Sequence, residues 1–115
     1  MTIVDLLNIL HGELLTPDAD TSAEVKSGHV GDLLSYVMAN AGAGSAWITV
    51  QTHLNVIAVA VLLEMCAVVV PGNIAVGQAT LDKAQEEGIA VISTGYDAFT
   101  CCGLLAQAGL AGSAG

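Results

Sequence analysis

The most informative part of the sequence is "WITVQTHLNVIAVAVLLEMCAVVVPGN", residues 47–73. Its pattern predicts a strand at residues 47–51, a helix at 52–65, a second strand at 66–70 and then a turn. The segment "VIAVAVLL" inside it is β-branched enough for a strand, but its length and its position between two strands favour a helix. A strand, a helix and another strand in this order indicate a right-handed unit with parallel strands.

Helices and strands alternate on both sides of this stretch. Thr2 can cap an opening helix, Asp32 can cap or charge the start of another, and Gly88 ends an amphipathic one. The alternation predicts an α/β fold, a single-domain three-layer α/β/α sandwich with a mostly parallel sheet. We expect the domain to cover residues 1–110, and residues 111–115 to form a flexible tail. The further elements predicted are helices at 2–12, 32–42, 78–88 and 96–109, strands at 13–15, 24–31 and 89–93, and a polar loop at 16–24.

The composition supports one folded domain with an aliphatic core. Of the 115 residues, 54% are hydrophobic and only 11% are charged, so the chain can bury a core and is not disordered. It contains one Trp, two Tyr and one Phe, and its core must therefore consist of Val, Ile, Leu and Ala. Continuous aliphatic runs are typical of parallel strands that helices cover on both faces.

The formal net charge of −9 excludes several classes of partner. Lys26 and Lys83 are the only lysines, and the chain has no arginine. Nucleic acids need a cationic surface, and anionic lipid surfaces are disfavoured for the same reason. A small phosphorylated ligand remains compatible with the charge, because helix N-termini bind anions through backbone N–H groups.

The apolar run Leu54–Val70 is too interrupted to span a membrane. Asn55 and Glu64 lie within it and Pro71 closes it, whereas a spanning helix needs about 20 predominantly apolar residues. The N-terminus lacks the basic and apolar regions of a secretory signal. We therefore predict no membrane span and a cytoplasmic location.

Two segments carry a resemblance to a known family. "SGHVGDLLSYVMANAGAGSAWITVQTHLNVIAVA", residues 27–60, begins with Gly-x-Val-x-Asp-Leu-Leu, and "GIAVISTGYDAF", residues 88–99, has the form Gly-Ile-x-Val-Ile/Leu-Ser-Thr-x-x-Asp-x-Phe. In their order and spacing, over essentially residues 1–110, these motifs resemble the DRTGG-domain proteins. The resemblance implies an α/β/α sandwich similar to the N-terminal domains of HPr kinase/phosphorylase and of the MurE and MurF ligases.

The resemblance also implies a regulatory or dimerising role. DRTGG domains occur between CBS domains in regulatory pyrophosphatases and in some phosphotransacetylases. The name motif Asp-Arg-Thr-Gly-Gly is absent because the chain has no arginine, so no contact of that arginine carries over. Kinase activity is rejected, since neither Lys26 nor Lys83 lies in the Gly-x-x-x-x-Gly-Lys-Ser/Thr loop that such phosphoryl transfer needs.

Polar residues gather where three predicted strands end. In open parallel sheets, ligands bind beyond the carboxyl ends of the strands. Residues 51–55, 71–73 and 93–97 should meet at that edge, where a crevice beside helix N-termini would accept a small anionic ligand or a nucleotide. The predicted ligand-binding residues are Thr52, His53, Asn55, Asn73, Ser93, Thr94, Gly95 and Asp97.

These residues also fit structural roles. Asn55 and Asp97 can be helix caps or first-turn residues, and Gly95 can be a turn residue with positive φ. General acid–base catalysis would need His53 within hydrogen-bond reach of a carboxylate such as Asp97. The sequence groups no acid, base and nucleophile, and we predict no catalytic residue, no metal site and no cofactor.

The three cysteines are predicted to be reduced. Cys66, Cys101 and Cys102 make an odd count without disulfide spacing. Adjacent residues on a helix diverge by about 100°, so Cys101 and Cys102 cannot jointly face one metal ion. We expect one of the two thiols in the core and the other partly exposed.

The low charge content bears on function, since few charges remain to cover the surface. This predicts a hydrophobic face shared with a second copy or a partner protein. We predict a non-catalytic regulatory or interaction domain that acts through homodimerisation or partner binding. The alternative is a small-molecule or nucleotide-sensing domain with its ligand at the carboxyl edge of the sheet.

Overall fold

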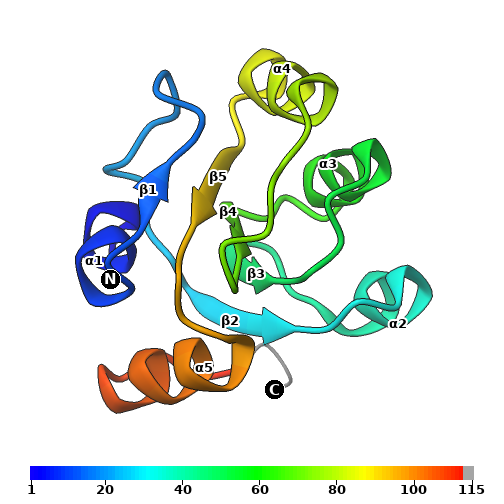
Figure 1. The fold of residues 1–115 in the computed structure, drawn as a ribbon. Helices are drawn as coiled ribbons and strands as arrows, with labels where there is room; N and C mark the ends of the chain where they lie inside the picture. Colours follow the sequence, from blue (N-terminus) through cyan, green and yellow to red (C-terminus); the bar gives the residue numbers. More distant parts are fainter. Residues whose placement is uncertain (113–115) are drawn as a thin grey trace.

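The computed structural model describes residues 1–112, which fold into a five-stranded sheet between two layers of helices (Figure 1). Each predicted helix and strand is present, and the stretch that also fitted a strand, "VIAVAVLL", lies in a helix. The elements are α1 (Ile3–Ile9), β1 (Glu13–Leu14), β2 (Ser27–Val30), α2 (Leu34–Asn40), β3 (Ser45–Ile48), α3 (Leu54–Leu62), β4 (Ala67–Val70), α4 (Gln78–Glu87), β5 (Ala90–Ser93) and α5 (Ala98–Gln107).

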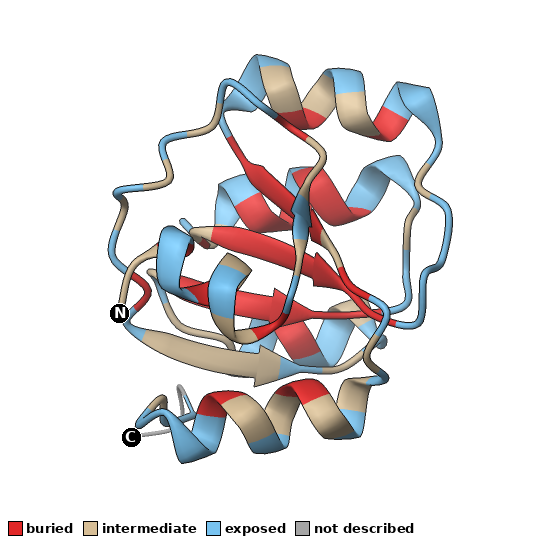
Figure 2. Cartoon of the chain, turned by 60° about the vertical axis from the view of Figure 1, so that its left-hand side comes forward, coloured by how far each residue is buried: buried red, intermediate tan, exposed pale blue. Residues whose placement is uncertain are grey.

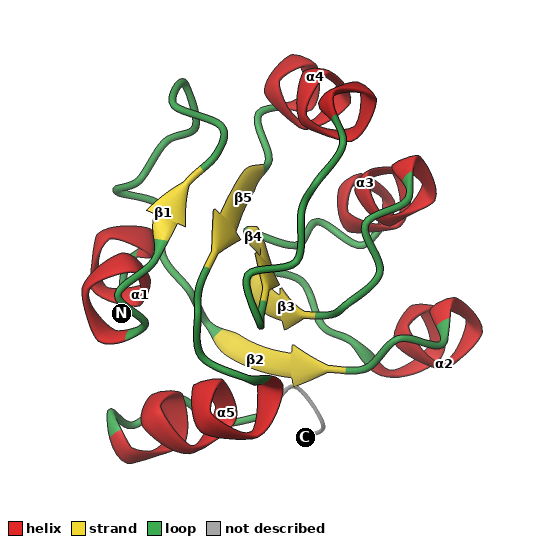
Figure 3. Cartoon of the chain, in the orientation of Figure 1, coloured by secondary structure: helices red, strands yellow, loops and turns green. Residues whose placement is uncertain are grey.

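The strands lie in the order β1-β5-β4-β3-β2. Neighbours from β2 to β5 pair in parallel, whereas β1 pairs with β5 antiparallel through only Glu13↔Ser93 and Leu14↔Ile92. The helices α2, α3 and α4 cover one face of the sheet, and α1 and α5 cover the other (Figure 3). The predicted α/β/α sandwich with a mostly parallel sheet is confirmed. The chain changes face after β5, so the loops after β4 and β5 lead to opposite sides.

The core has two halves, one on each face of the sheet. Successive strand residues alternate between them, so that Val69 packs towards α1 and α5 while Val68 and Val70 pack towards α2, α3 and α4. Figure 2 shows that the central strands are buried along their length. Trp47 is the largest fully buried side chain, and its indole N–H donates to the carbonyl oxygen of Gly31 at 2.8 Å.

Several helix ends follow the predicted caps. The hydroxyl of Thr2 accepts from the Asp5 backbone N–H at 3.3 Å, and the Asp5 carboxylate accepts from that of Thr2 at 2.8 Å. Gly88 ends α4 in the left-handed conformation, with φ +71°. Asp97 caps α5, because its Oδ1 accepts from the Thr100 backbone N–H at 2.7 Å.

One predicted cap is wrong. The N-cap of α2 is Leu33, without a side-chain hydrogen bond, and Asp32 does not cap this helix. The Asp32 Oδ1 instead accepts from the hydroxyl of Thr49 at 2.7 Å and from the backbone N–H of Val50 at 2.9 Å. Because Val50 bonds to this carboxylate, β3 ends at Ile48 and not at residue 51 as predicted.

The last described residues run along the outer edge of β2. The Gly28 backbone N–H donates to the carbonyl oxygen of Ala111 at 2.8 Å, and Gly112 forms a parallel bridge with Gly28. The predicted tail thus begins in contact with β2, while its residues 113–115 lie outside the described residues. Within residues 1–112, no helix is long and apolar enough to cross a membrane.

Candidate functional site at the carboxyl edge of the sheet

The predicted ligand-binding residues lie at the carboxyl ends of β3, β4 and β5, which share one edge because the strands are parallel. The structure does not gather them in one crevice, because β4 and β5 lead to helices on opposite faces. One group follows β3 and the other belongs to β5 and the loops after β4 and β5. The first contains Thr52, His53 and Asn55, and the second contains Asn73, Ser93, Thr94, Gly95 and Asp97.

The first group borders an open cavity of about 650 Å³ between the N-terminal ends of α3 and α4. Thr80, in the first turn of α4, donates its hydroxyl to the Thr52 carbonyl oxygen at 2.8 Å, and this bond joins the two walls. Of the predicted residues, Thr52 and His53 line the cavity directly. The full lining consists of Val50, Gln51, Thr52, His53, Leu54, Gly77, Ala79 and Thr80.

Two helix N-termini meet at this cavity. The cap of α3 is His53 and not Asn55: the His53 Nδ1 accepts from the Asn55 backbone N–H at 3.1 Å. The N-cap of α4 is Gly77, which has no side chain and leaves the first-turn N–H groups without a side-chain cap. Such N–H groups, together with the helix dipole, attract anions. The cavity therefore suits a small anion.

The second group lies in two loops that close on each other. The Gly72 backbone N–H donates to the Tyr96 carbonyl oxygen at 2.8 Å. The Asn73 backbone N–H donates to the Thr94 carbonyl oxygen at 3.0 Å. The buried Thr94 hydroxyl donates to the carbonyl oxygen of Leu10 at 2.7 Å and accepts from the Tyr96 N–H at 3.2 Å. These bonds hold the loops after β4 and β5 against each other.

Gly95 does not have the positive φ that we predicted for it. A Cβ atom at this position would lie 3.3 Å from the Asn73 side-chain nitrogen, which is tighter than ordinary contact. Asn73 itself has φ +55°, in the left-handed region that glycine favours. The absence of a side chain at Gly95 thus accommodates the neighbouring loop.

His11 and Tyr96 form a polar contact at this edge that the sequence analysis did not identify. The Tyr96 hydroxyl lies 3.3 Å from His11 Nδ1, and both line a cavity of about 370 Å³ with Leu10, Thr94 and Gly95. His11 reaches this place because β1 is antiparallel to β5, so that the turn before β1 lies beside the loop after β5. The orientation of so short a strand has no signal in the sequence.

The pair needed for acid–base catalysis is not formed. His53 accepts from Asn55 and Asp97 accepts from Thr100, and the two residues begin helices on opposite faces of the sheet. Since His53 Nδ1 accepts a hydrogen bond, the neutral ring carries its proton on Nε2. His53 can therefore donate a hydrogen bond from Nε2 to a ligand. At Asp97, hydrogen bonds from Thr100 keep the pKa of the carboxyl group below its usual value.

The cysteines are free, with Cys101 in the core and Cys66 and Cys102 partly exposed; the difference between Cys101 and Cys102 is as expected for adjacent helical residues. Burial raises the pKa of the Cys66 thiol to about 11, and burial with the nearby Cys102 and Asp97 raises the pKa of Cys101 to about 11. Both thiols are protonated near neutral pH. In the described part of the chain, no three His, Cys, Asp or Glu side chains gather to form a metal site.

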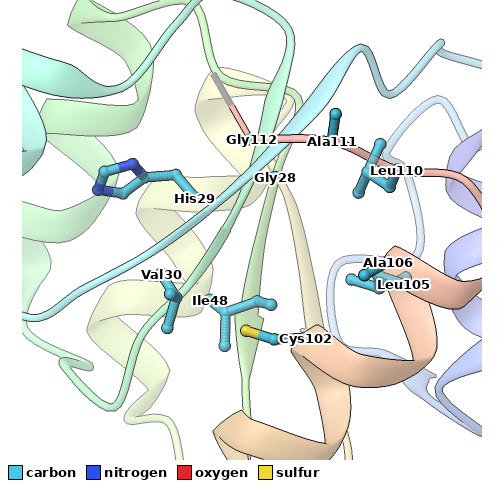
Figure 4. Close-up of a pocket in the computed structure, with 10 residues that line it drawn as sticks. All are labelled: Gly28, His29, Val30, Ile48, Cys102, Leu105, Ala106, Leu110, Ala111 and Gly112. Atoms are coloured by element: carbon cyan, nitrogen blue, oxygen red, sulfur yellow. The ribbon is translucent and has the colours of Figure 1, made fainter. Parts of the chain in front are cut away.

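An apolar cavity of about 190 Å³ lies between β2 and α5 (Figure 4). Val30, Ile48 and Cys102 lie around it, while the His29 ring points away from it. Apart from the Cys102 thiol, its side-chain lining is apolar, so it offers no donor for an anionic ligand. The remaining lining residues are Gly28, Leu105, Ala106, Leu110, Ala111 and Gly112.

Comparisons with known proteins place this fold in a family. Residues 5–108 match the DRTGG domain family, and the chain belongs to it. The fold is similar to the crystal structure of the CBS and DRTGG domains of the regulatory region of Clostridium perfringens pyrophosphatase, complexed with the activator diadenosine tetraphosphate. The TM-score is 0.70 at 17% identity, and the match covers 92% of this chain and 46% of the other, about half its length. No curated protein sequence matches significantly.

Proposed function

We propose that this chain is a non-catalytic regulatory domain that binds a small anionic ligand, such as a nucleotide, in the cavity between α3 and α4. The observation that carries the proposal is the meeting of two helix N-termini at one cavity, where α4 begins at Gly77 without a side-chain cap. The backbone N–H groups supply the attraction that the chain cannot supply with arginine.

The fold neighbour supports a regulatory role. It is a regulatory region in complex with an activator that contains adenosine and phosphate groups. The position proposed for the ligand rests on the geometry of this chain alone, with His53 and Thr52 on the α3 side and the first turn of α4 opposite. Such a domain would transmit ligand binding without performing chemistry.

Thermal unfolding tests this proposal. ATP, AMP, diadenosine tetraphosphate and inorganic phosphate are added separately, with adenosine as the uncharged control. A ligand that binds only the folded state raises the free energy of unfolding by mass action, by about 2.7 kcal/mol at a concentration 100 times its Kd, and the melting temperature rises with it. A shift with a phosphorylated compound and none with adenosine is expected. The absence of any shift overturns the ligand-binding function.

A substitution at Gly77 tests the position. Its φ is −66° and nothing lies within 4 Å of an added Cβ atom, so a side chain fits there. In Gly77→Asp the carboxylate caps the first turn and repels an anion, and the ligand-induced shift should disappear while the fold persists. Gly77→Asn supplies a cap without charge and should reduce the shift less. An unchanged shift in Gly77→Asp places the ligand elsewhere.

A homodimer is a second candidate for the way in which the domain acts. It is supported by large apolar side chains that the domain leaves in contact with solvent, of which Phe99, Leu33 and Leu62 are the most exposed. Where such side chains form a contiguous patch on a small domain, the patch marks an interaction site. Sedimentation equilibrium of the full chain at micromolar concentration distinguishes a monomer from a dimer.

A further inference from the structure

One long segment of the chain carries no charge. Between Asp32 and Glu64 there is no Asp, Glu, Lys or Arg, although the whole chain has a net charge of −9. The segment contains both α2 and α3, which lie side by side on the same face of the sheet (Figure 1). The outer side of this helix pair therefore differs from the rest of the acidic surface.

The outer side of α2 and α3 also exposes several large apolar side chains. Helix α3 directs Val56, Ile57 and Ala60 into the core, and other large residues of the pair remain exposed. Six of the eleven large hydrophobic residues that the described chain exposes belong to this pair or its caps. We call them the uncharged face: Leu33, Tyr36, Met38, Leu54, Val61 and Leu62.

The uncharged face extends across the helix layer. Both helices follow parallel strands and run in the same direction, from the carboxyl edge of the sheet to the opposite edge. Leu33 lies at the start of α2 and is 68% exposed, while Leu62 lies at the end of α3 and is 66% exposed. Neighbouring α4 carries charges, among them the Lys83–Glu87 ion pair at 3.1 Å, and borders the face on one side.

We propose that the uncharged face binds the same face of a second copy of this chain, an inference that rests on the homodimer named above as the second candidate. Two copies with a net charge of −9 repel each other, and carboxylates placed opposite one another in an interface cost free energy. The uncharged face is where two copies meet without opposing carboxylates. It offers no counter-charge to a basic partner, and apolar surface is complementary to itself across a two-fold axis.

A dimer through the uncharged face requires a certain area of surface. A standard interface buries about 800 Å² on each partner, which is about a seventh of the 5686 Å² that the chain exposes. The uncharged segment, residues 33–63, makes up about a quarter of the chain and forms two of the three helices on its side of the sheet. A dimer of ordinary size would therefore need about a seventh of the chain's exposed surface from this side of the helix layer.

Sedimentation equilibrium of charge variants tests the face. Leu62→Glu and Leu33→Glu each place a carboxylate opposite its own copy, and we expect the dimer Kd to rise more than tenfold. Phe99→Glu is the matched control, because Phe99 is 88% exposed on α5, on the opposite face of the sheet. Circular dichroism checks that the variants fold, and Leu62→Gln provides a milder second change.

Each outcome is decisive. The proposed face is supported if Leu62→Glu and Leu33→Glu weaken the dimer and Phe99→Glu does not. A dimer that resists both substitutions on the face overturns the inference but leaves the homodimer standing. A wild-type chain that stays monomeric overturns both. Added salt should strengthen the dimer by screening the repulsion between the copies, whereas a dimer held by ion pairs would weaken.

Discussion

The Asp32 carboxylate accepts a hydrogen bond of 2.7 Å from the buried Thr49 hydroxyl and thereby ties the loop after β2 to the loop after β3. The same oxygen accepts from the Val50 N–H at 2.9 Å. The loop that it holds leads directly to Thr52 and His53. Asp32 therefore supports one wall of the proposed ligand cavity without lining it.

Removal of this carboxylate should destabilise the fold. In Asp32→Ala the buried Thr49 hydroxyl loses its acceptor, at a cost of about 1–3 kcal/mol in the free energy of unfolding. In Thr49→Val the hydroxyl is already absent. Asp32→Ala should therefore lower the free energy of unfolding less in the Thr49→Val variant than in the wild type. Urea unfolding of the two single variants and the double variant measures the coupling. Strictly additive costs would show that the bond contributes nothing.

Two exposed glycines should respond in opposite directions to alanine. Gly88 has φ +71°, so Gly88→Ala should lower the unfolding free energy by about 1–2 kcal/mol through backbone strain alone. Gly103 lies within α5 with nothing near an added Cβ atom, and Gly103→Ala should raise it by about 0.5–1 kcal/mol. Chemical denaturation checks both. Equal effects would contradict the left-handed conformation of Gly88.

The Asp97 cap of α5 should make the free energy of unfolding decrease as the pH falls into the acidic range. Hydrogen bonds from Thr100 lower the pKa of Asp97 from its usual value of 3.8, so the folded state favours the carboxylate. The resulting stability is present above about pH 4 and is lost as the pH falls through the lowered pKa. Asp97→Asn keeps a capping oxygen without the charge. Its melting temperature should therefore vary less with pH than that of the wild type below pH 4, and parallel curves would refute the cap.

The cysteines should differ in reactivity. Thiolates react with iodoacetamide and thiols do not, and burial raises the pKa of all three cysteines. Cys101 is fully buried, whereas Cys102 is partly exposed. Mass spectrometry of the folded chain should find Cys102 alkylated before Cys101, and both at similar rates in urea. Faster reaction of Cys101 in the folded chain would contradict the packing of α5.

The sequence predicts the architecture well because hydrophobic periodicity and helix caps are local signals. The strands around Val69 and Ile92 are recognisable from unbroken aliphatic runs, and Gly88 and Asp97 mark helix ends through their own chemistry. The prediction for Asp32 was wrong because its partner Thr49 lies 17 residues away in the sequence, directly after the neighbouring strand β3. The Asp32 carboxylate can bond either to the distant Thr49 hydroxyl or to the N–H groups at the nearby start of α2. The sequence does not reveal which of the two bonds forms.

The candidate site was predictable as an edge of the sheet but not as a cavity. The ends of parallel strands indicate where loops meet, and Thr52 and His53 indeed border an opening there. That Thr94 turns inward to Leu10, and that Gly77 leaves α4 uncapped, depend on how loops pack. The role of His53 as a cap follows from one side-chain rotamer, for which the sequence has no signal.

The short antiparallel pairing of β1 affects how the domain opens. Two residue pairs join β1 to β5, and the Leu15 N–H adds a bond of 2.8 Å to the carbonyl oxygen of Val91. The Thr16 hydroxyl, at the end of this segment, donates to the Ile89 carbonyl oxygen and accepts from the Val91 N–H, each at 3.0 Å. Native proteins open in parts, and segments with few bonds open at a lower free energy than the core. Hydrogen exchange at Leu15 should therefore report a partial opening, while amides of Trp47 and Val69 exchange only when the whole domain unfolds. In such an opening β1 would separate from β5 and leave the edge of β5 unpaired.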